Sequence, residues 1–292
     1  VLGYSVAVNK WVTYEELDNH LYSLENQPDA IPYVTSYYLE RWGFCLSHNQ
    51  RIILDKTKKY QVVIDSTLEP GILNYGEVIL KGKSTKEVFL STYICHPSMA
   101  NNELSGPVVA TAISKWLGTL DLNYTYRIIF IPETIGSLVY LSKHLEYLKK
   151  NVIAGFNLTC IGDDRCYSYL PSRNGNTLSD RVAKHVLKHI DPEYKKYTWL
   201  DRGSDERQYC APGIDLPIAT IMRSKYATYP EYHTSLDDLE LVTPSGLGGG
   251  FSAVQQAIFI IENNAIPCVL VYGEPQLSKR GLYQNITGKL PL

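Results

Sequence analysis

The feature that most constrains the fold is an alternation, from residue 86 onward, between continuous apolar runs and amphipathic helical patterns. The runs EVFLSTYIC, YRIIFIP, NVIAGFNLTCIG and LPIATIM are typical of central strands that are buried on both faces. Helical patterns accompany them at residues 104–117, 134–149, 177–190 and 243–263. Strands that alternate with helices predict an α/β fold with a mostly parallel, doubly wound sheet.

The first part of the chain, residues 1–85, has a different pattern. Short apolar stretches alternate there with Gly, Pro and charged residues, and an amphipathic helix is expected around 14–24. This pattern predicts a small β-rich accessory domain before the α/β domain, which spans residues 86–265. Residues 266–292 are expected to form an extended C-terminal tail. Because the chain begins with valine and leads directly into an apolar stretch, it stays open whether it is a fragment of a longer protein.

Composition restricts the classes of function. The chain has 28 Lys and Arg against 30 Asp and Glu, so no basic excess favours nucleic acid as a partner. The apolar runs are much shorter than the roughly 18 residues that a membrane helix needs. Six widely spaced cysteines without a C-x-x-C motif favour reduced thiols and a cytoplasmic location. An oligomeric state stays open.

Polar residues occur where the predicted strands end. His96 ends the first central strand, Glu133 the second and Thr159 the third, whereas His233 follows the fourth strand by a loop. Because the carboxyl ends of parallel strands share one edge of a sheet, we expect these side chains to lie close together.

These residue types favour a metal site. His96 lies in the stretch STYICHPSMANNELSG and is followed seven residues later by Glu103. Two histidines and a carboxylate are ligands that zinc prefers, although a lone histidine is more often structural. Glu133 allows two interpretations, a first-turn glutamate that stabilises its helix by about 0.3–1 kcal/mol or a general base for hydrolysis. The residues alone leave both open.

A charged segment, DRGSDERQYCAPG, borders the same predicted edge and supplies candidate substrate contacts. Asp205 is a candidate to hold the neighbouring loops or to touch a ligand, and Glu206, Glu231 or Asp237 to anchor a substrate amine. Arg207 suits a substrate carboxylate or phosphate, and Tyr232, next to His233, suits a pocket wall. The motifs of serine hydrolases and of nucleotide-binding loops are absent from the sequence, and GLGGG at 246–250 has no preceding strand.

The order of the motifs resembles that of the zinc-dependent aminopeptidase and glutaminyl-cyclase superfamily. The motifs are a strand ending in His, then NELSG, PETIG, SDER and YHTSLD. This set is most similar to the aminopeptidase-like proteins of bacterial surface-polysaccharide gene clusters. The resemblance covers roughly residues 90–245. It implies a three-layer α/β/α sheet of the phosphorylase/hydrolase type, with zinc at its carboxyl edge and a smaller β-rich insert domain. It also implies a further N-terminal segment and a C-terminal winged helix, neither of which we expect within this sequence.

Matched residue by residue, the resemblance implies His96 and His233 as metal ligands and Glu133 as the general base. Three positions depart from the family pattern: Asn102 stands where a metal-bridging aspartate is expected, Thr134 at a metal-binding glutamate and Thr159 at a third-strand aspartate. Because two adjacent zinc ions need several carboxylates to offset their charge, these departures favour one zinc over two. One ion bound by His96, His233 and Glu103 remains chemically sensible.

The resemblance and the residues together predict a zinc-dependent amide hydrolase of aminopeptidase type, an exopeptidase-like enzyme that acts on a small peptide, an aminoacyl compound or an amino sugar. Two alternatives stay open. The missing ligands favour an inactive, peptidase-like binding protein, and the implied polysaccharide setting favours a zinc-dependent deacylase that acts on amino-sugar precursors, or an aminoacyl transfer.

Overall fold

The structure is a computed structural model that describes residues 1–270, 272–273 and 276–282. The chain divides into two compact units, Val1–Glu262 and Asn263–Leu292. In the described part of the second unit, a 3-10 turn, η3, spans Leu277–Arg280. The predicted tail extends to residue 292, and its last ten residues lie outside the described part of the chain.

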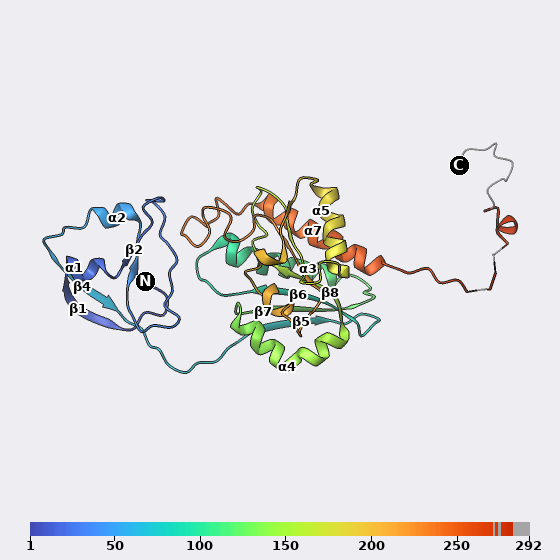
Figure 1. Cartoon of the computed structure of the whole chain (residues 1–292), viewed down its shortest axis with the longest axis horizontal. Helices are drawn as coiled ribbons and strands as arrows, with labels where there is room; N and C mark the ends of the chain where they lie inside the picture. The colour runs from blue at the N-terminus through green and yellow to red at the C-terminus, as the bar shows by residue number, and fades with distance from the viewer. Residues whose placement is uncertain (271, 274–275, 283–292) are drawn as a thin grey trace. The chain divides into compact units, whose positions relative to one another are not determined.

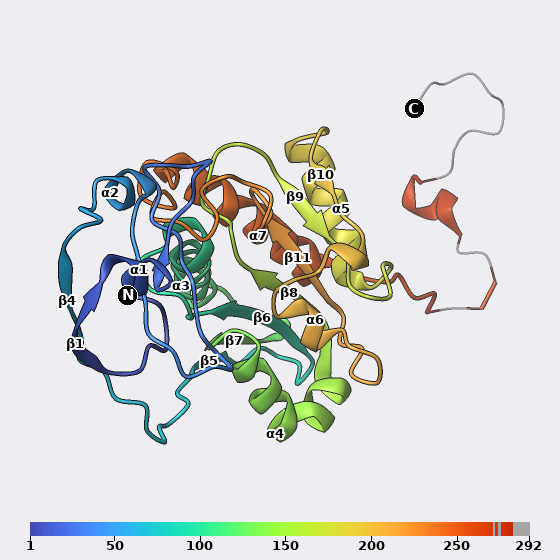
Figure 2. The same cartoon turned by 60° about the vertical axis from the view of Figure 1, so that its left-hand side comes forward.

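Seven strands form the central sheet of the first unit, in the order β10, β9, β11, β8, β6, β7 and β5, and all of them are labelled in Figure 2, a turned view of Figure 1. Their bounds are β5 Gly76–Leu80, β6 Glu87–Tyr93, β7 Thr125–Ile131, β8 Val152–Leu158, β9 Ser168–Leu170, β10 Lys195–Lys196 and β11 Ile218–Met222. Strands β11, β8, β6 and β7 run parallel to one another, whereas β5 and β9 pair antiparallel with β7 and β11. The predicted α/β fold with a mostly parallel sheet is confirmed.

Helices cover both faces of this sheet. Their bounds are α3 Ser105–Leu117, α4 Ile135–Asn151, α5 Leu178–Ile190, α6 Glu206–Tyr209 and α7 Pro244–Asn263. Figures 1 and 2 show α5 and α7 on one face and α4 on the other. Alternate residues of one strand serve the two faces, since Val88 and Leu90 of β6 pack with α3, α5 and α7 while Phe89 packs with α4 and α6.

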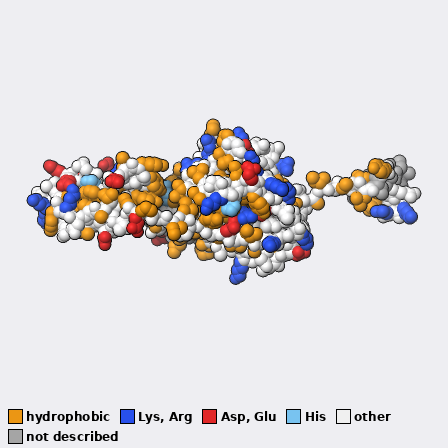
Figure 3. Space-filling view, turned by 90° about the horizontal axis from the view of Figure 1, so that it is seen from below, with side chains coloured by type: hydrophobic (Ala, Val, Ile, Leu, Met, Phe, Trp, Pro, Cys, Tyr) orange, Lys and Arg blue, Asp and Glu red, His pale blue; other side chains and the backbone are white. Residues whose placement is uncertain are grey.

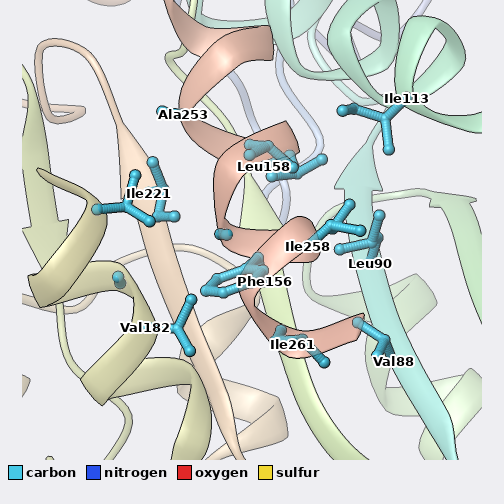
Figure 4. Close-up of a cluster of buried hydrophobic side chains, with 14 of the residues drawn as sticks. Val88, Leu90, Ile113, Phe156, Leu158, Val182, Ile221, Ala253, Ile258 and Ile261 are labelled. Carbon is cyan, nitrogen blue, oxygen red and sulfur yellow. The ribbon is translucent and has the colours of Figure 1, made fainter. Parts of the chain in front are cut away.

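The core on the α3, α5 and α7 face explains why the strand sequences are continuously apolar. Phe156 and Leu158 of β8 contact Ile221 of β11, Ile258 of α7 and the neighbouring side chains drawn in Figure 4. Each fully buried side chain of this size contributes about 1.5–3 kcal/mol relative to an exposed one. All seven residues of β6 are buried, which is the burial that the predicted two-faced strand requires.

Two glycines allow helices to approach the sheet closely. A Cβ at Gly106, near the start of α3, would lie 2.4 Å from the carbonyl oxygen of Leu158. A Cβ at Gly250, in the GLGGG run of α7, would lie 2.3 Å from the carbonyl oxygen of Ile161. The glycine run therefore serves helix–sheet packing.

Residues 1–64 contain a smaller lobe with its own apolar core. Strands β1 (Val8–Thr13) and β4 (Lys59–Ile64) form an antiparallel pair, and the short β2 (Leu21–Tyr22) and β3 (Phe44–Cys45) form a parallel one. Two one-turn helices, α1 (Tyr14–Asp18) and α2 (His48–Ile52), complete it. The helix expected at 14–24 is wrong beyond Asp18, because Leu21 and Tyr22 leave the helix to pair with β3.

Two boundaries differ from the sequence pattern. Strand β5 lies before the domain boundary predicted at residue 85, yet it pairs with β7 in the large sheet. The helix expected from residue 104 begins earlier, with a π-helical turn, η1, over Ala100–Leu104. Turns of this kind are rare and often occur at functional sites.

The exterior is mixed in charge. On the face shown in Figure 3, acidic and basic side chains are interspersed and neither forms one continuous patch. Among the described residues, no helix is both long and apolar enough to cross a bilayer.

Candidate metal centre

The predicted site residues meet at one edge of the sheet. His96 follows β6, Glu133 follows β7 and Thr159 follows β8, and these strands are parallel, so their carboxyl ends share this edge. The backbone here is unusual, because the non-glycine residues Ser98, Thr134, Cys160 and His233 all have φ between 46° and 67°. Such conformations cost about 1–3 kcal/mol each and are concentrated at functional sites.

The two predicted histidine ligands lie side by side. The ring centroids of His96 and His233 are 4.8 Å apart, with an interplanar angle of 61°. Burial lowers the pKa of His96, and burial together with the neighbouring His96 lowers that of His233 to about 4. Both imidazoles are therefore neutral at pH 7, which is the form that binds a metal ion.

A tyrosine from the small lobe holds both imidazoles. The ring of Tyr33 stacks on His96 at 4.5 Å between centroids and meets His233 edge-on at 5.7 Å. Its backbone N–H donates to the carbonyl oxygen of His233 at 2.8 Å. Ile31 and Ser235 exchange further hydrogen bonds beside this contact. Residues 31–33 thus form one wall of the site, which local sequence patterns did not indicate.

Glu103 projects from the π-helical turn toward His96. Its Oε2 accepts a hydrogen bond from the backbone N–H of Cys95, and its Oε1 lies 3.9 Å from Nδ1 of His96. Within the described part of the chain this buried Oε1 has no hydrogen-bond partner. Burial raises the pKa of Glu103 to about 8. A divalent cation would satisfy the free oxygen and favour the ionised carboxylate.

The π-helical turn is itself held by a buried carboxylate, Asp237. Its two oxygens accept the backbone N–H groups of Asn101 and Asn102, at 2.5 and 3.0 Å. The hydroxyl of Tyr229 donates to the same carboxylate at 3.1 Å. The sequence pattern did not indicate this anchoring role, and it leaves Asp237 little capacity to bind a substrate amine.

Glu133 lies between polar and charged neighbours. The pKa of Glu133 is raised to about 7, chiefly by burial and also by Glu206, while Arg207 and Ser204 oppose the rise. Arg207 is exposed and donates to the hydroxyl of Thr134 at 2.7 Å, directly after Glu133 in the chain. A carboxylate whose pKa is close to 7 is suited to exchange protons at neutral pH.

The other predicted substrate residues differ in their access to open space. Asp205 and Glu206 are both fully buried. Asp205 accepts the backbone N–H of Thr134 at 2.8 Å, and Glu206 accepts the hydroxyl of Tyr226 at 2.6 Å along with other groups of the 203–204 turn. These two carboxylates hold the protein's own loops. Tyr232 is half-buried and stacks on His233 at 3.9 Å, so it lines the site as expected.

Two of the three positions without the expected carboxylates, Asn102 and Thr159, are joined by a tyrosine. The hydroxyl of Tyr93 lies 2.5 Å from Oγ1 of Thr159 and accepts a hydrogen bond from Nδ2 of Asn102 at 2.6 Å. Burial keeps the pKa of Tyr93 far above its ordinary value. This network is therefore neutral, and it occupies side-chain positions that a second metal ion would need.

The residues present fit one metal ion. Cys95, His96 and Glu133 have potential ligand atoms that all lie within 4.8 Å of one another. Oε1 of Glu103 lies 3.9 Å from Nδ1 of His96, and this atom and Oδ1 of Asn102 are both buried without a hydrogen-bond partner in the described part of the chain. Sequence analysis missed Cys95, although its place immediately before His96 was the available signal. Neutral imidazoles, carboxylate oxygen and sulfur form a donor set that suits zinc.

Comparison with known proteins identifies the class of protein first. The fold matches BSAP, a zinc aminopeptidase from Bacillus subtilis, with a TM-score of 0.61 and 16% identity, covering 89% of this chain and 69% of that one. It also matches the glutaminyl cyclase from Porphyromonas gingivalis, with a TM-score of 0.53 and 14% identity over 64% of this chain and 77% of that one. Identities this low show the fold alone. The predicted resemblance to the zinc aminopeptidase and glutaminyl-cyclase superfamily is confirmed.

The particular family follows from closer matches. The model of a domain of unknown function, DUF4910, matches residues 7–264, and the chain belongs to this family. A protein from Clostridium acetobutylicum, named as a polysaccharide biosynthesis protein with an aminopeptidase-like domain, is 43% identical over 289 residues, which are 99% of this chain. A crystal structure of a protein from that organism, described as a peptidase, has a TM-score of 0.90 and 42% identity over 96% of this chain. This chain spans 66% of the length of each.

Proposed function

We propose that this chain is a zinc-dependent amide hydrolase of aminopeptidase type that uses one zinc ion. The observation that carries the proposal is the set of groups around His96. The ring of His233 lies 4.8 Å away between centroids, Oε1 of Glu103 lies 3.9 Å from Nδ1, and Cys95 and Glu133 offer ligand atoms within 4.8 Å. His96, His233 and Glu103 would hold the ion. The neutral network around Tyr93 supports a single ion, because the carboxylates that a second ion needs are replaced by Asn102 and Thr159.

Zinc, when bound, supplies a Lewis acid for the substrate carbonyl and lowers the pKa of a water molecule toward about 7. Glu133 accepts the proton of the attacking water at its carboxylate and donates it to the leaving amine. Arg207 and Ser204 lower the pKa of Glu133 and so favour its ionised, proton-accepting form at neutral pH. Tyr33 and Tyr232 stack on the two imidazoles, fix their orientation and exclude water from their faces.

Replacing Glu133 with glutamine tests the proposal. The chain with Glu133→Gln should retain about one equivalent of zinc and lose hydrolysis of a panel of aminoacyl amides by at least about 10²-fold, since general-base catalysis contributes about that much. Glu146→Gln, an exposed change on α4, is the matched control and should leave the rate unchanged. Wild-type turnover in Glu133→Gln would reject the assignment. Absence of zinc from freshly purified wild-type chain would instead favour the inactive binding protein.

A second candidate is deacylation of amino sugars, and a surface groove favours it. The groove has a volume of about 590 Å³ and lies in the small lobe, where its lining includes Tyr4, Tyr37, Tyr38, Glu40 and Glu69. Aromatic faces stack on the C–H faces of sugar rings, and carboxylates accept hydrogen bonds from sugar hydroxyls.

The groove is linked to the metal centre through one side chain. Burial raises the pKa of Tyr33, and the neighbouring Tyr37 of the groove raises it further. Tyr33 in turn stacks on His96. Tyr37 of the groove thus neighbours a side chain that contacts a proposed metal ligand.

The two candidates predict different substrates. The amine anchors that an aminopeptidase needs are engaged here, because Glu206 and Asp237 bind the protein's own groups and Glu231 pairs with Arg165. The deacylase is selected if the chain releases acetate from N-acetyl amino sugars faster than it releases amino acids from aminoacyl amides, and if Tyr38→Ala lowers the rate of acetate release. The opposite order, unaffected by Tyr38→Ala, would select the aminopeptidase.

A further inference from the structure

We infer that Cys95 is a metal ligand, so that the ion is bound by a thiolate sulfur together with imidazole nitrogen and carboxylate oxygen. The inference rests on the metal centre of the proposed function and gives it four protein ligands, so the water that Glu133 activates would need a fifth position on the ion, which catalytic zinc can provide. The Sγ atom of Cys95 lies 3.0 Å from Nδ1 of His96. It also shares with His96 and Glu133 a group of potential ligand atoms within 4.8 Å of one another.

The spacing of these atoms suits one tetrahedral ion. Zinc bonds of about 2.0–2.3 Å place any two of its ligand atoms roughly 3.5 Å apart. Two measured distances lie on either side of this value. Nδ1 of His96 is 3.0 Å from the sulfur of Cys95 and 3.9 Å from Oε1 of Glu103. Nδ1 of His96 is thus close to each of the other two atoms, and the group whose ligand atoms all lie within 4.8 Å of one another is formed by Cys95, His96 and Glu133.

Glu103 gives an independent reason to place an ion here. Its side chain is more than nine-tenths buried, and its Oε1 has no hydrogen-bond partner in the described part of the chain. Its other oxygen accepts the backbone N–H of Cys95 at 2.9 Å. The same carboxylate therefore faces the ion with one oxygen and positions the cysteine with the other, as supporting groups of metal ligands commonly do.

Charge explains why a thiolate would be useful at this site. Asn102, Thr134 and Thr159 supply no negative charge where the superfamily pattern expects carboxylates. Glu103 alone would leave the ion with one excess positive charge, and the thiolate of Cys95 brings the site to neutrality. The thiol proton passes to solvent as the metal binds. A sulfur ligand also favours zinc or cobalt over magnesium and calcium, which prefer oxygen.

Cobalt reports directly on sulfur ligation. The 292-residue chain, freed of metal, would be titrated with Co²⁺ alone and its near-ultraviolet absorption recorded. We expect a sulfur-to-cobalt charge-transfer band that reaches its full height at about one equivalent. Cys95→Ser should lose the band and bind Co²⁺ at least about tenfold more weakly, as loss of metal-site partners typically does. Cys268→Ser, a change at a second exposed cysteine, should leave the spectrum unchanged.

Alkylation of the wild-type chain provides a measurement that does not depend on a variant's folding. Cys95 and Cys268 are both exposed free thiols. Iodoacetamide labelling followed by peptide mass spectrometry should show that zinc slows modification of Cys95 on the order of tenfold and leaves Cys268 unaffected, because a coordinated thiolate is a weaker nucleophile than a free one.

The outcomes separate this inference from the proposed function. Three results would overturn the cysteine ligand: cobalt binding without a charge-transfer band, a band that persists in Cys95→Ser, or equal alkylation of Cys95 with and without zinc. Any of them would leave a metal centre of nitrogen and oxygen donors. Failure of the wild-type chain to bind either Co²⁺ or Zn²⁺ would overturn the metal centre itself.

Discussion

Removing the ring of Tyr33 should weaken zinc binding, although Tyr33 is not a proposed ligand. The ring makes two aromatic contacts, stacked on His96 and edge-on to His233. Each aromatic pair contributes about 0.5–1.5 kcal/mol beyond its buried area, so the two together hold the imidazoles in place by about 1–3 kcal/mol. If this energy fixes the ligands for the ion, Tyr33→Ala should raise the Kd for zinc roughly 5- to 150-fold.

The variant isolates the side chain. The hydrogen bond from Tyr33 to His233 is made by the backbone N–H and remains in Tyr33→Ala. Tyr33→Phe keeps the ring and should bind zinc within about twofold of wild type, because the aromatic contacts persist. Tyr38→Ala is a matched control in the same lobe, since that side chain is 95% exposed.

The assay is competition between the chain and a chromophoric chelator for zinc, with circular dichroism of each metal-free variant as a check of folding. Two results would refute the reasoning. Wild-type zinc affinity in folded Tyr33→Ala would show that the small lobe does not position the ligands. An equal loss of affinity in Tyr33→Phe and Tyr33→Ala would assign the effect to the hydroxyl.

Three further predictions concern stability, measured by urea denaturation of the metal-free chain. Burial raises the pKa of Asp205 from 3.8 to about 7, so the folded state binds an extra proton between these pH values. The free energy of unfolding should therefore fall by up to roughly 4 kcal/mol as the pH rises through this range. Asp205→Asn should reduce this fall between pH 4 and pH 8, and an unchanged fall would contradict the buried-acid explanation. Tyr93→Phe should lower the free energy of unfolding by about 1–3 kcal/mol, because Nδ2 of Asn102 and the hydroxyl of Thr159 lose their partner; no loss would mean that the network does not stabilise the fold. Phe156→Ala should cost about 3–5 kcal/mol, since this side chain is fully buried in the core, and a loss below 1 kcal/mol would show that the core is packed differently.

The strands that carry the site could be predicted from the sequence, because their burial on both faces leaves continuous apolar runs. Strands β6, β8 and β11 lie within the runs that indicated them, and β7 begins one residue before its run. The rule that parallel strands share a carboxyl edge then brings His96, Glu133 and His233 together without any further information. The ligand roles given to these residues stay predictions that the metal experiments test.

The parts that the sequence did not indicate depend on contacts between distant segments. Tyr33 meets His96 and His233 only because residues 31–33 run beside residues 233–235. The charged segment around Glu206 has the composition of a solvated loop, yet the fold buries this carboxylate against the hydroxyl of Tyr226. Local periodicity carries no signal for either contact, because each is decided by how separate elements pack.

The unpartnered oxygens at the site bear on whether the chain still binds metal. A buried polar atom without a hydrogen bond costs about 1–3 kcal/mol. A binding protein without metal would be expected to lose such groups, and the neutral network of Tyr93 shows how they can be satisfied. Yet Glu103 keeps a free buried oxygen that lies 3.9 Å from a neutral imidazole, and Asn102 keeps another. These two costs are reasonable if a cation offsets them. The departures from the superfamily pattern therefore fit the proposed one-ion site better than an abandoned one.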